Sequence, residues 1–427
     1  MSATRSPWAW IPTLYFAQGI PYVVVMTLSV VLYKNLGISN TDIALYTSWL
    51  YLPWVIKPLW SPLAELFGTK RRWVTVLQFF VGAALSGVAL TIPTDKVFQL
   101  SLAVFWLMAF ASASHDIAAD GYYMLALPQH SQAAYVGVRS TFYRLANIAG
   151  QGGLVYLAGA LTERTGSVVH AWTVVFWVLG AMFIALAAWH SFVLPHPATD
   201  KPSAGGAAAH GLIKDFFAVF ASFFRKPGIA VILGFLLLYR FPEAQLLKLA
   251  SPFLLDSVDK GGLALSTKDV GLAYGTVGII ALTVGGLVGG WVISRIGLKR
   301  ALWPLVLAMH VPNVAFLLLA MTHPTSLWVI SGALAVEQFG YGLGFTAYLM
   351  YMIHVAEGEK KTAHYAICTG FMALGMMIPG MWSGWLQDHI GYVPFFGWVL
   401  IATLPSFVMA ALIKVPDDFG KKKEEDA

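Results

Sequence analysis

Long apolar runs recur along the whole chain, and each is long enough to cross a membrane. A helix of about 20 mostly apolar residues spans the roughly 30 Å hydrocarbon core of a bilayer. Runs of this kind occupy most of the 427 residues. The short connections between them carry polar or helix-breaking residues, as in 36–42 (LGISNTD) and 388–391 (DHIG). The sequence therefore predicts an all-α membrane protein.

The runs predict twelve transmembrane helices. The predicted spans are 9–33, 42–63, 73–92, 97–126, 136–161, 171–193, 228–254, 268–293, 301–321, 326–353, 363–386 and 393–413. The first span is expected to be retained, because the basic N-terminus runs into it without a small-residue cleavage site.

The composition excludes a water-soluble protein. Residues of hydrophobic type make up 58% of the chain and charged residues 11%, which is more apolar surface than a water-facing shell tolerates. A single cysteine, Cys368, excludes internal disulfides and a cysteine-based metal site. The patterns GxxxxGK[ST], HExxH and CxxC are absent. We therefore expect no enzyme, no metal and no cofactor.

The placement of Lys and Arg predicts the orientation, because cytoplasmic loops carry an excess of both. With the N-terminus inside, the cytoplasmic segments hold Arg5, Lys70, Arg71, Arg72, Lys201, Lys214, Arg225, Lys226, Arg295, Lys299, Arg300, Lys360, Lys361, Lys414 and residues 421–423. The opposite side holds Lys34, Lys96, Arg164, Lys260 and Lys268. Both termini are thus predicted to be cytoplasmic. The net charge of +6 is a topology signal and not a nucleic-acid patch.

One long connection, 194–227, divides the spans into two sets of six. It begins rich in Pro, Ala and Gly, and phenylalanines recur at helical spacing near its end. We expect an amphipathic helix on the inner leaflet there, or else an early start to span seven. The predicted domains are a six-helix bundle at 1–193, the linker at 194–227, a second bundle at 228–413 and a charged tail at 414–427.

The two halves repeat a pattern at their second span. Residues 36–46 (LGISNTDIALY) align with 263–274 (LALSTKDVGLAY), which places Ser39 over Ser266 and Asp42 over Asp269. One helix later, 61–73 (SPLAELFGTKRRW) aligns with 290–303 (GWVISRIGLKRALW). Two parallel six-helix repeats with a site between them are the expected architecture.

The turn after the second span resembles the signature loop of the major facilitator superfamily. In the first copy Leu63, Ala64, Glu65, Gly68, Lys70 and Arg71 match that loop. The second copy keeps Gly290, Arg295, Gly297, Lys299 and Arg300, with Ser294 in the acidic position. Glycine provides the tight turn, while the acid and bases cap helix ends or form ion pairs. We expect these residues, together with Arg144, to have gating or structural roles.

Ionisable groups inside predicted spans need a physical reason. Burying one charged side chain in the bilayer costs about 3 kcal/mol or more unless the charge is paired or hydrated. In the first half Asp116 and Asp120 lie at i and i+4, on one face of span four. They require either neutralising bases or a shared proton. The available bases are Lys57, Arg139 and Arg144. The pattern is equally compatible with two interpretations. The charges either form a cluster that stabilises this half, or they form a site that binds substrate or a proton.

The second half has its own buried charges. Tyr239, Arg240, Pro242 and Glu243 interrupt span seven near its middle, and Lys248 follows. Arginine suits carboxylate or phosphate groups because its planar fork binds two oxygens at once. Glu337 in span ten has no adjacent base, which is typical of a proton carrier. His115, Gln18 and Gln338 add uncharged polarity.

Several segments, in order through both halves, resemble AmpG-type permeases and the related acetyl-CoA transporters. They are 16–22 (FAQGIPY), 52–65 (LPWVIKPLWSPLAE), 114–123 (SHDIAADGYY), 137–151 (GVRSTFYRLANIAGQ), 238–256 (LYRFPEAQLLKLASPFLLD) and 362–370 (TAHYAICTG). His115 stands where the family usually has Gln, Arg240 replaces Lys, and Glu243 replaces Asp. The resemblance implies a proton-driven secondary transporter of muropeptides of the GlcNAc-anhydroMurNAc type.

The expected protein is therefore a monomeric importer in a bacterial inner membrane, working by alternating access. The residues expected to bind the small-molecule substrate are Arg240, Glu243, Lys57, Gln18 and Tyr239. The residues expected to carry protons are Asp116, Asp120 and Glu337. One alternative keeps the fold but changes the cargo to a siderophore or another metabolite. A further alternative, from a different class, is a membrane sensor that transports nothing.

Overall fold

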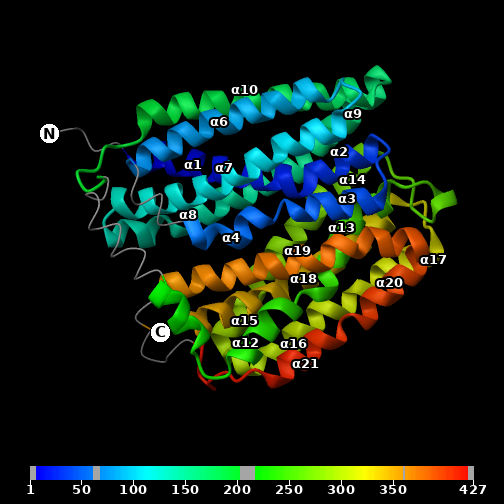
Figure 1. Cartoon of the computed structure of the whole chain (residues 1–427). Helices are drawn as coiled ribbons and strands as arrows, with labels where there is room; N and C mark the ends of the chain where they lie inside the picture. Colours follow the sequence, from blue (N-terminus) through cyan, green and yellow to red (C-terminus); the bar gives the residue numbers. More distant parts are fainter. Residues whose placement is uncertain (1–5, 61–67, 202–216, 359–360, 422–427) are drawn as a thin grey trace. The chain divides into compact units, whose positions relative to one another are not determined.

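A computed structural model describes residues 6–60, 68–201, 217–358 and 361–421, and these are helical apart from short connections (Figure 1). Contacts divide the chain into two compact units. Unit 1 contains residues 1–32 and 56–217, and unit 2 contains residues 33–55 and 218–427. The predicted bundles, 1–193 and 228–413, follow chain order. Residues 33–55 instead cluster with the second set of helices.

The helices of unit 1 follow the predicted spans. They are α1 (Ile11–Val23), α4 (Leu52–Trp60), whose first four residues belong to unit 2, α6 (Lys70–Thr91), α7 (Val97–Ala126), α8 (Gln129–Asn147), α9 (Val155–Thr165) and α10 (Val168–Val193). Helices α6 and α10 lie side by side, as do α1 and α8 (Figure 1). A core of Trp10, Leu14, Tyr122 and their neighbours packs α1 against α7.

The helices of unit 2 include α3, which precedes α4 in the chain. They are α3 (Asn40–Trp49), α12 (Ile229–Leu238), α13 (Phe241–Leu255), α14 (Thr267–Val270), α15 (Ile279–Ile296), α16 (Leu298–His310), α17 (Val314–Thr322), α18 (Leu327–Ala356), α19 (Lys361–Ile390), α20 (Tyr392–Ile401) and α21 (Leu404–Leu412). Helix α2 (Ser29–Asn35) continues α1 and crosses the boundary between the two units. Helix α3 packs along α19, and α15 packs along α18 (Figure 1). Residues 217–224 of the linker are helical, and the start of the predicted amphipathic helix lies outside the described residues.

Within the described part of the chain, nine helical stretches are long and apolar enough to cross a membrane, and each coincides with a predicted span. They are Pro7–Asn35, Lys70–Thr91, Val97–Ala126, Val168–Val193, Ile229–Leu255, Thr267–Ile296, Leu298–Thr322, Lys361–Ile390 and Tyr392–Leu412. The other predicted spans, 42–63, 136–161 and 326–353, are helical where described but are interrupted or more polar. The count of twelve therefore stays a prediction.

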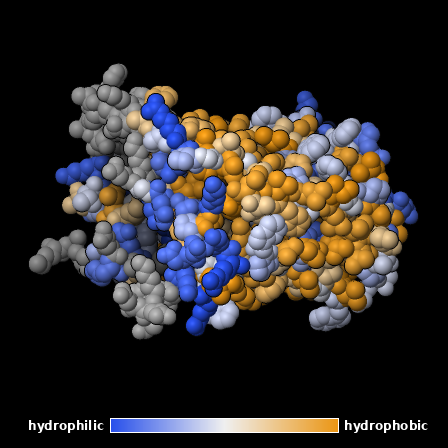
Figure 2. Space-filling model, turned by 90° about the horizontal axis from the view of Figure 1, so that it is seen from below, coloured by the Kyte–Doolittle hydropathy of each residue, from blue (hydrophilic) through white to orange (hydrophobic). Residues whose placement is uncertain are grey.

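Large apolar side chains cover much of the outer surface. Trp328 is 89% exposed, Phe192 75% and Leu287 65%. Figure 2 shows hydrophobic side chains gathered over the middle of the face that it presents, with hydrophilic ones concentrated toward one end. Contiguous apolar surface of this extent requires lipid in place of water.

The aligned segments of the predicted repeat begin with matching helix caps. Ser39 and Ser266 each precede a helix, and each side-chain oxygen accepts a hydrogen bond from the backbone N–H of Asp42 or Asp269, at 3.0 and 3.1 Å. Each serine hydroxyl also donates to the carboxylate of its own aspartate at 2.8 Å. Because an N-cap satisfies helix donors that otherwise lack a partner, the same three-residue spacing starts a helix in both halves.

Candidate functional site

A break in the middle of span seven positions the charged residues of unit 2. Helix α12 ends at Leu238, and α13 begins at Phe241 after Arg240, whose φ of −105° and ψ of 17° are not helical. Pro242 lies in the first turn of α13, where its missing N–H costs nothing. The predicted interruption is confirmed. It places the carboxylate of Glu243 in the positive field of a helix N-terminus.

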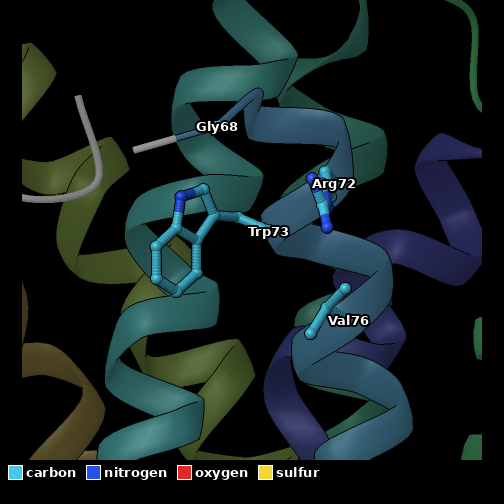
Figure 3. Close-up of a pocket in the computed structure, with 4 residues that line it drawn as sticks. All are labelled: Gly68, Arg72, Trp73 and Val76. Atoms are coloured by element: carbon cyan, nitrogen blue, oxygen red, sulfur yellow. The ribbon is translucent and has the colours of Figure 1, made fainter. Parts of the chain in front are cut away.

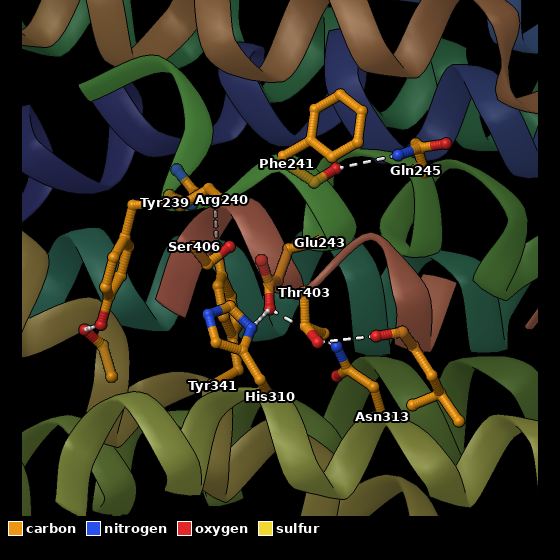
Figure 4. A network of polar contacts seen from close by, with 12 residues as sticks. Tyr239, Arg240, Phe241, Glu243, Gln245, His310, Asn313, Tyr341, Thr403 and Ser406 are labelled. Atoms are coloured by element: carbon orange, nitrogen blue, oxygen red, sulfur yellow. Dashed lines mark hydrogen bonds and ion pairs between the residues drawn. The ribbon is translucent and has the colours of Figure 1, made fainter. Parts of the chain in front are cut away.

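Glu243 forms an acid–base pair with His310 at the end of α16 (Figure 4). The Nδ1 of His310 lies 2.8 Å from the Oε1 of Glu243, and both side chains are buried. The side-chain amide of Asn313 donates to the same oxygen at 3.5 Å. The rings of Tyr239 and Phe407 pack edge-on against the imidazole, with centroids 5.8 and 5.4 Å away.

Two polar atoms of this pair have no hydrogen-bond partner among the described residues. They are the Oε2 of Glu243 and the Nε2 of His310, and the Oδ1 of Asn313 is in the same condition. A buried polar atom without a partner costs about 1–3 kcal/mol, and more when it is charged. The pair therefore retains places for a proton or a ligand atom that the protein itself does not fill.

Arg240 extends from the break toward α18 (Figure 4). Its guanidinium donates to the hydroxyl of Tyr341 and lies 4.8 Å from the ring centroid of Phe345. Tyr239 is fully buried, and its hydroxyl donates to the carbonyl oxygen of Gly344 at 2.9 Å. The Tyr239 ring stacks on that of Tyr348. A hydrogen bond to the backbone and ring stacking thus fix the orientation of Tyr239, the residue before Arg240.

Two further ionisable side chains are buried in unit 2. Glu337 on α18 is 1% exposed and accepts a hydrogen bond from the amide of Gln338 at 2.9 Å. Lys248 on α13 is 5% exposed, donates to the hydroxyl of Thr47 at 2.8 Å and lies 5.3 Å from the ring centroid of Tyr51. A buried ammonium bonded to a neutral hydroxyl is suited to an anionic ligand.

In unit 1, the carboxylates of Asp116 and Asp120 on α7 each form an ion pair with a different basic side chain. The Nζ of Lys57 lies 3.4 Å from the Oδ2 of Asp116, and an Nη of Arg139 lies 2.9 Å from the Oδ1 of Asp120. The hydroxyl of Tyr15 also donates to Asp120 at 3.3 Å, and its ring lies under the guanidinium of Arg139. These side chains are partly exposed, with 38% for Asp120.

Other polar residues of unit 1 lie apart from these pairs. Gln18 is 7% exposed, and its Oε1 has no partner among the described residues. Arg144 is half-buried near the end of α8. His115 belongs to a buried chain: its Nε2 lies 3.0 Å from the Nε2 of Gln78, whose Oε1 lies 2.7 Å from the Nδ1 of His190.

The first copy of the signature turn is held by the segment that follows α10. Gly68 has a φ of +73°, and Glu65 lies outside the described residues. The backbone N–H groups of Lys70 and Arg71, at the start of α6, donate to the two carboxylate oxygens of Asp200 at 2.7 and 3.0 Å. A hollow of about 290 Å³ beside this turn is lined by Gly68, Arg72, Trp73 and Val76 (Figure 3). It is separate in sequence from the buried charges.

The second copy is held in a related way by the residues that follow α21. Gly297 has a φ of +81°, and the N–H of Leu298 donates to the carbonyl of Phe419 at 2.8 Å. The Nζ of Lys299 lies 2.6 Å from the Oδ1 of Asp417, and this contact lowers the pKa of Asp417. Arg295 packs over the ring of Trp291, and Arg300 is exposed. In each unit, the chain that leaves the last helix binds back to this turn.

His310, Asn313, Gln78 and His190 were not among the predicted residues. His310 could have been found in the same way as the buried charges. Its imidazole is an ionisable group in the middle of the apolar run 301–321, which is a predicted span. The signal for Gln78 and His190 is weaker, since a single polar residue in a long span is common. Their contacts depend on how the helices pack, which the sequence does not encode locally.

Buried charges and acid–base pairs inside long apolar helices define a multi-pass membrane protein with a polar interior. Residues 13–378 match the family model described as Major Facilitator Superfamily. The chain therefore belongs to this superfamily, and it is a secondary transporter and not an enzyme.

Similar proteins are found along nearly the whole chain. The anhydromuropeptide permease of Escherichia coli K12 is 25% identical over 404 residues, covering 93% of this chain and 77% of that protein. The putative transporter AmpG 4 of Rickettsia conorii is 25% identical over 408 residues, covering 92% and 93%. An uncharacterized protein of Haemophilus influenzae is also 25% identical, over 407 residues, covering 92% and 91%. The predicted resemblance to AmpG-type permeases is confirmed.

Solved transporter structures share the fold. A POT family transporter in complex with 5-aminolevulinic acid has a TM-score of 0.70 at 10% identity, covering 94% of each chain. A D-xylose-proton symporter has a TM-score of 0.66 at 13% identity, covering 97% of this chain and 98% of that one. The nucleoside transporter NupG has a TM-score of 0.64 at 17% identity, covering 95% and 98%. The major facilitator fold is thereby established.

Proposed function

We propose that this protein imports a polar, anionic solute of the muropeptide class, GlcNAc-anhydroMurNAc with or without peptide, across a bacterial inner membrane by proton symport. The observation that carries this proposal is the buried cation Lys248, held by a neutral hydroxyl. The lactyl and peptide carboxylates of a muropeptide supply the negative charge that such a site lacks. Similarity to the Escherichia coli permease over 93% of the chain supports the same cargo class.

The predicted roles of the remaining residues form part of the proposal. The residues that contact the cargo are Arg240, Lys57, Gln18 and Tyr239, and those that exchange protons are Asp116, Asp120 and Glu337. Each of the three acids lies in a helix of a predicted span. Glu243, which the sequence also predicts as a cargo contact, is assigned a different role below. A third set of residues gates the pathway or stabilises its cytoplasmic end. The set consists of Glu65, Gly68, Lys70, Arg71, Arg144, Arg295, Gly297, Lys299 and Arg300.

Uptake of labelled GlcNAc-anhydroMurNAc into proteoliposomes that hold the purified protein tests this function. An inward proton gradient is expected to drive accumulation above equilibrium, and a protonophore is expected to abolish it. Accumulation that ignores the protonophore would remove proton coupling. Failure to move the disaccharide, together with uptake of an iron-loaded siderophore in the same vesicles, would transfer the proposal to the alternative cargo. A chain that binds but moves neither would be a sensor.

A further inference from the structure

We propose that Glu243 and His310 together form the proton-carrying site of unit 2, in which His310 receives the transported proton and Glu243 holds the resulting imidazolium. This inference rests on the proposed proton symport and deepens it. It changes the role of Glu243 from cargo contact to proton handling. It also assigns a function to His310, which no sequence feature of the family resemblance suggested.

The geometry first limits where the proton resides. Because the Nδ1 of His310 faces the Oε1 of Glu243 at 2.8 Å, one proton always lies between these two atoms. The N-terminus of α13 favours the ionised carboxylate, so this proton is on the imidazole and the pair carries a charge of −1. A second proton has two available atoms, the Nε2 of His310 and the Oε2 of Glu243. Binding at Nε2 forms one N–H bond and brings the pair to neutrality.

The surroundings make this change of charge consequential. The ionisable groups near the pair are Arg240 and Tyr239 at the helix break and Glu337 on α18, which lies within electrostatic reach of Glu243. The side of the pair that faces α21 and the turn before it is lined by Phe407, Ser406 and Thr403 (Figure 4). These side chains do not titrate near neutral pH. The pair is therefore isolated from water by apolar and hydroxyl groups, where one unit of charge has a large effect.

Coupling to cargo follows from the summed charge of the pair and Arg240, with the buried carboxyl of Glu337 counted in its neutral form. Without the second proton, the pair at −1 balances the guanidinium at +1. With the proton bound, the three side chains carry +1, and an anionic group of the cargo restores neutrality. Because a net charge is unfavourable in this buried region, proton and anion bind together or not at all. That is the thermodynamic requirement for symport.

The test compares Glu243→Gln and His310→Gln with His364→Gln in proteoliposomes. His364 is a matched control, a buried histidine of unit 2 whose Nε2 lies 2.9 Å from the hydroxyl of Ser222. Two assays use labelled GlcNAc-anhydroMurNAc: uptake driven by a proton gradient, and exchange against unlabelled disaccharide without a gradient. Glu243→Gln leaves the guanidinium of Arg240 unbalanced, so this variant is expected to bind cargo without a proton, which means that it loses accumulation above equilibrium and retains exchange. His310→Gln keeps Glu243 opposite Arg240 but lacks the proton site, so it is expected to lose both activities, while His364→Gln retains both.

Accumulation retained by either pair variant would overturn the inference. Loss of exchange along with accumulation in both variants would also overturn it, because the pair would then bind cargo or hold the fold. If the wild-type protein does not move the disaccharide, the proposed function fails, and infrared difference spectra of the purified protein across the imidazole titration range decide the pair separately. A histidine signal absent from His310→Gln and altered in Glu243→Gln supports the pair. Identical spectra in all variants overturn it.

Discussion

The Nζ of Lys34 lies 2.7 Å from the Oδ1 of Asp256, and the two side chains are only 11% and 6% exposed. The other oxygen of Asp256 accepts hydrogen bonds from the hydroxyl of Tyr392 at 2.7 Å and the amide of Asn40 at 3.3 Å. Asn40 also donates to Gln387 at 2.6 Å. Within unit 2, this network ties the segment 33–55 to the ends of α13, α19 and α20. An open state, in which the segment 33–55 separates from these helices, must break it.

Asp256→Asn is expected to favour that open state. Removal of one partner from a buried ion pair costs about 3–5 kcal/mol, and the slight exposure here reduces this figure. Ser48 on α3 is fully buried and lies close to Gly380 of α19, so Ser48→Cys reports separation of these helices in a Cys368→Ala background. We expect labelling by a membrane-impermeant maleimide to become at least about tenfold faster, which corresponds to about 1.4 kcal/mol.

Asp259→Asn is the matched control, because Asp259 is an exposed acid three residues further along. Equal labelling rates in Asp256→Asn and Asp259→Asn would show that the ion pair does not hold the two helices together. The double variant Lys34→Met with Asp256→Leu is expected to label more slowly than Asp256→Asn alone, because no buried charge is then left without a partner.

We expect the carboxylate of Asp200 to contribute measurably to the free energy of unfolding of unit 1. It accepts two backbone N–H groups at the start of α6, at 2.7 and 3.0 Å. Replacement of such a cap costs about 1–2 kcal/mol. We therefore expect Asp200→Ala to lower the thermal unfolding midpoint in detergent. Asp95→Ala, which changes an exposed acid in the loop before α7, is expected to leave it unchanged. Equal midpoints for both would contradict the role of Asp200.

The sequence predicts the features that depend on short stretches of chain. The length of each apolar run sets the spans, and Ser39 with Asp42 starts a helix through contacts three residues apart. Pro242 marks the break in span seven for the same reason. The pairing of Glu243 with His310 joins residues 67 apart. It depends on the rotation of α13 and α16 about their axes, which a single sequence does not specify. The clustering of residues 33–55 with unit 2 is likewise a long-range property.

Lys248→Met is expected to weaken cargo binding without weakening the fold. Methionine matches the length of the lysine stem, and removal of a buried ammonium relieves its desolvation cost. We expect KM for GlcNAc-anhydroMurNAc uptake to rise about tenfold or more, equivalent to about 1.4 kcal/mol of binding. The unfolding midpoint should stay the same or rise. Lys226→Met, near the start of α12, serves as the control. An unchanged KM in Lys248→Met would remove Lys248 from the cargo site.

The same substitution at two glycines of α18 is expected to have opposite effects. A Cβ at Gly342 would meet the backbone of Leu282 and Gly286 on α15, whereas a Cβ at Gly332 would have nothing within 4 Å. Gly342→Ala must push two packed helices apart, at a cost of about 1–3 kcal/mol. Gly332→Ala instead gains about 0.5–1 kcal/mol from higher helix propensity. Thermal unfolding in detergent should therefore shift down for the first variant and up for the second. An upward shift for both would mean that α15 and α18 pack less closely at Gly342 than the structure shows.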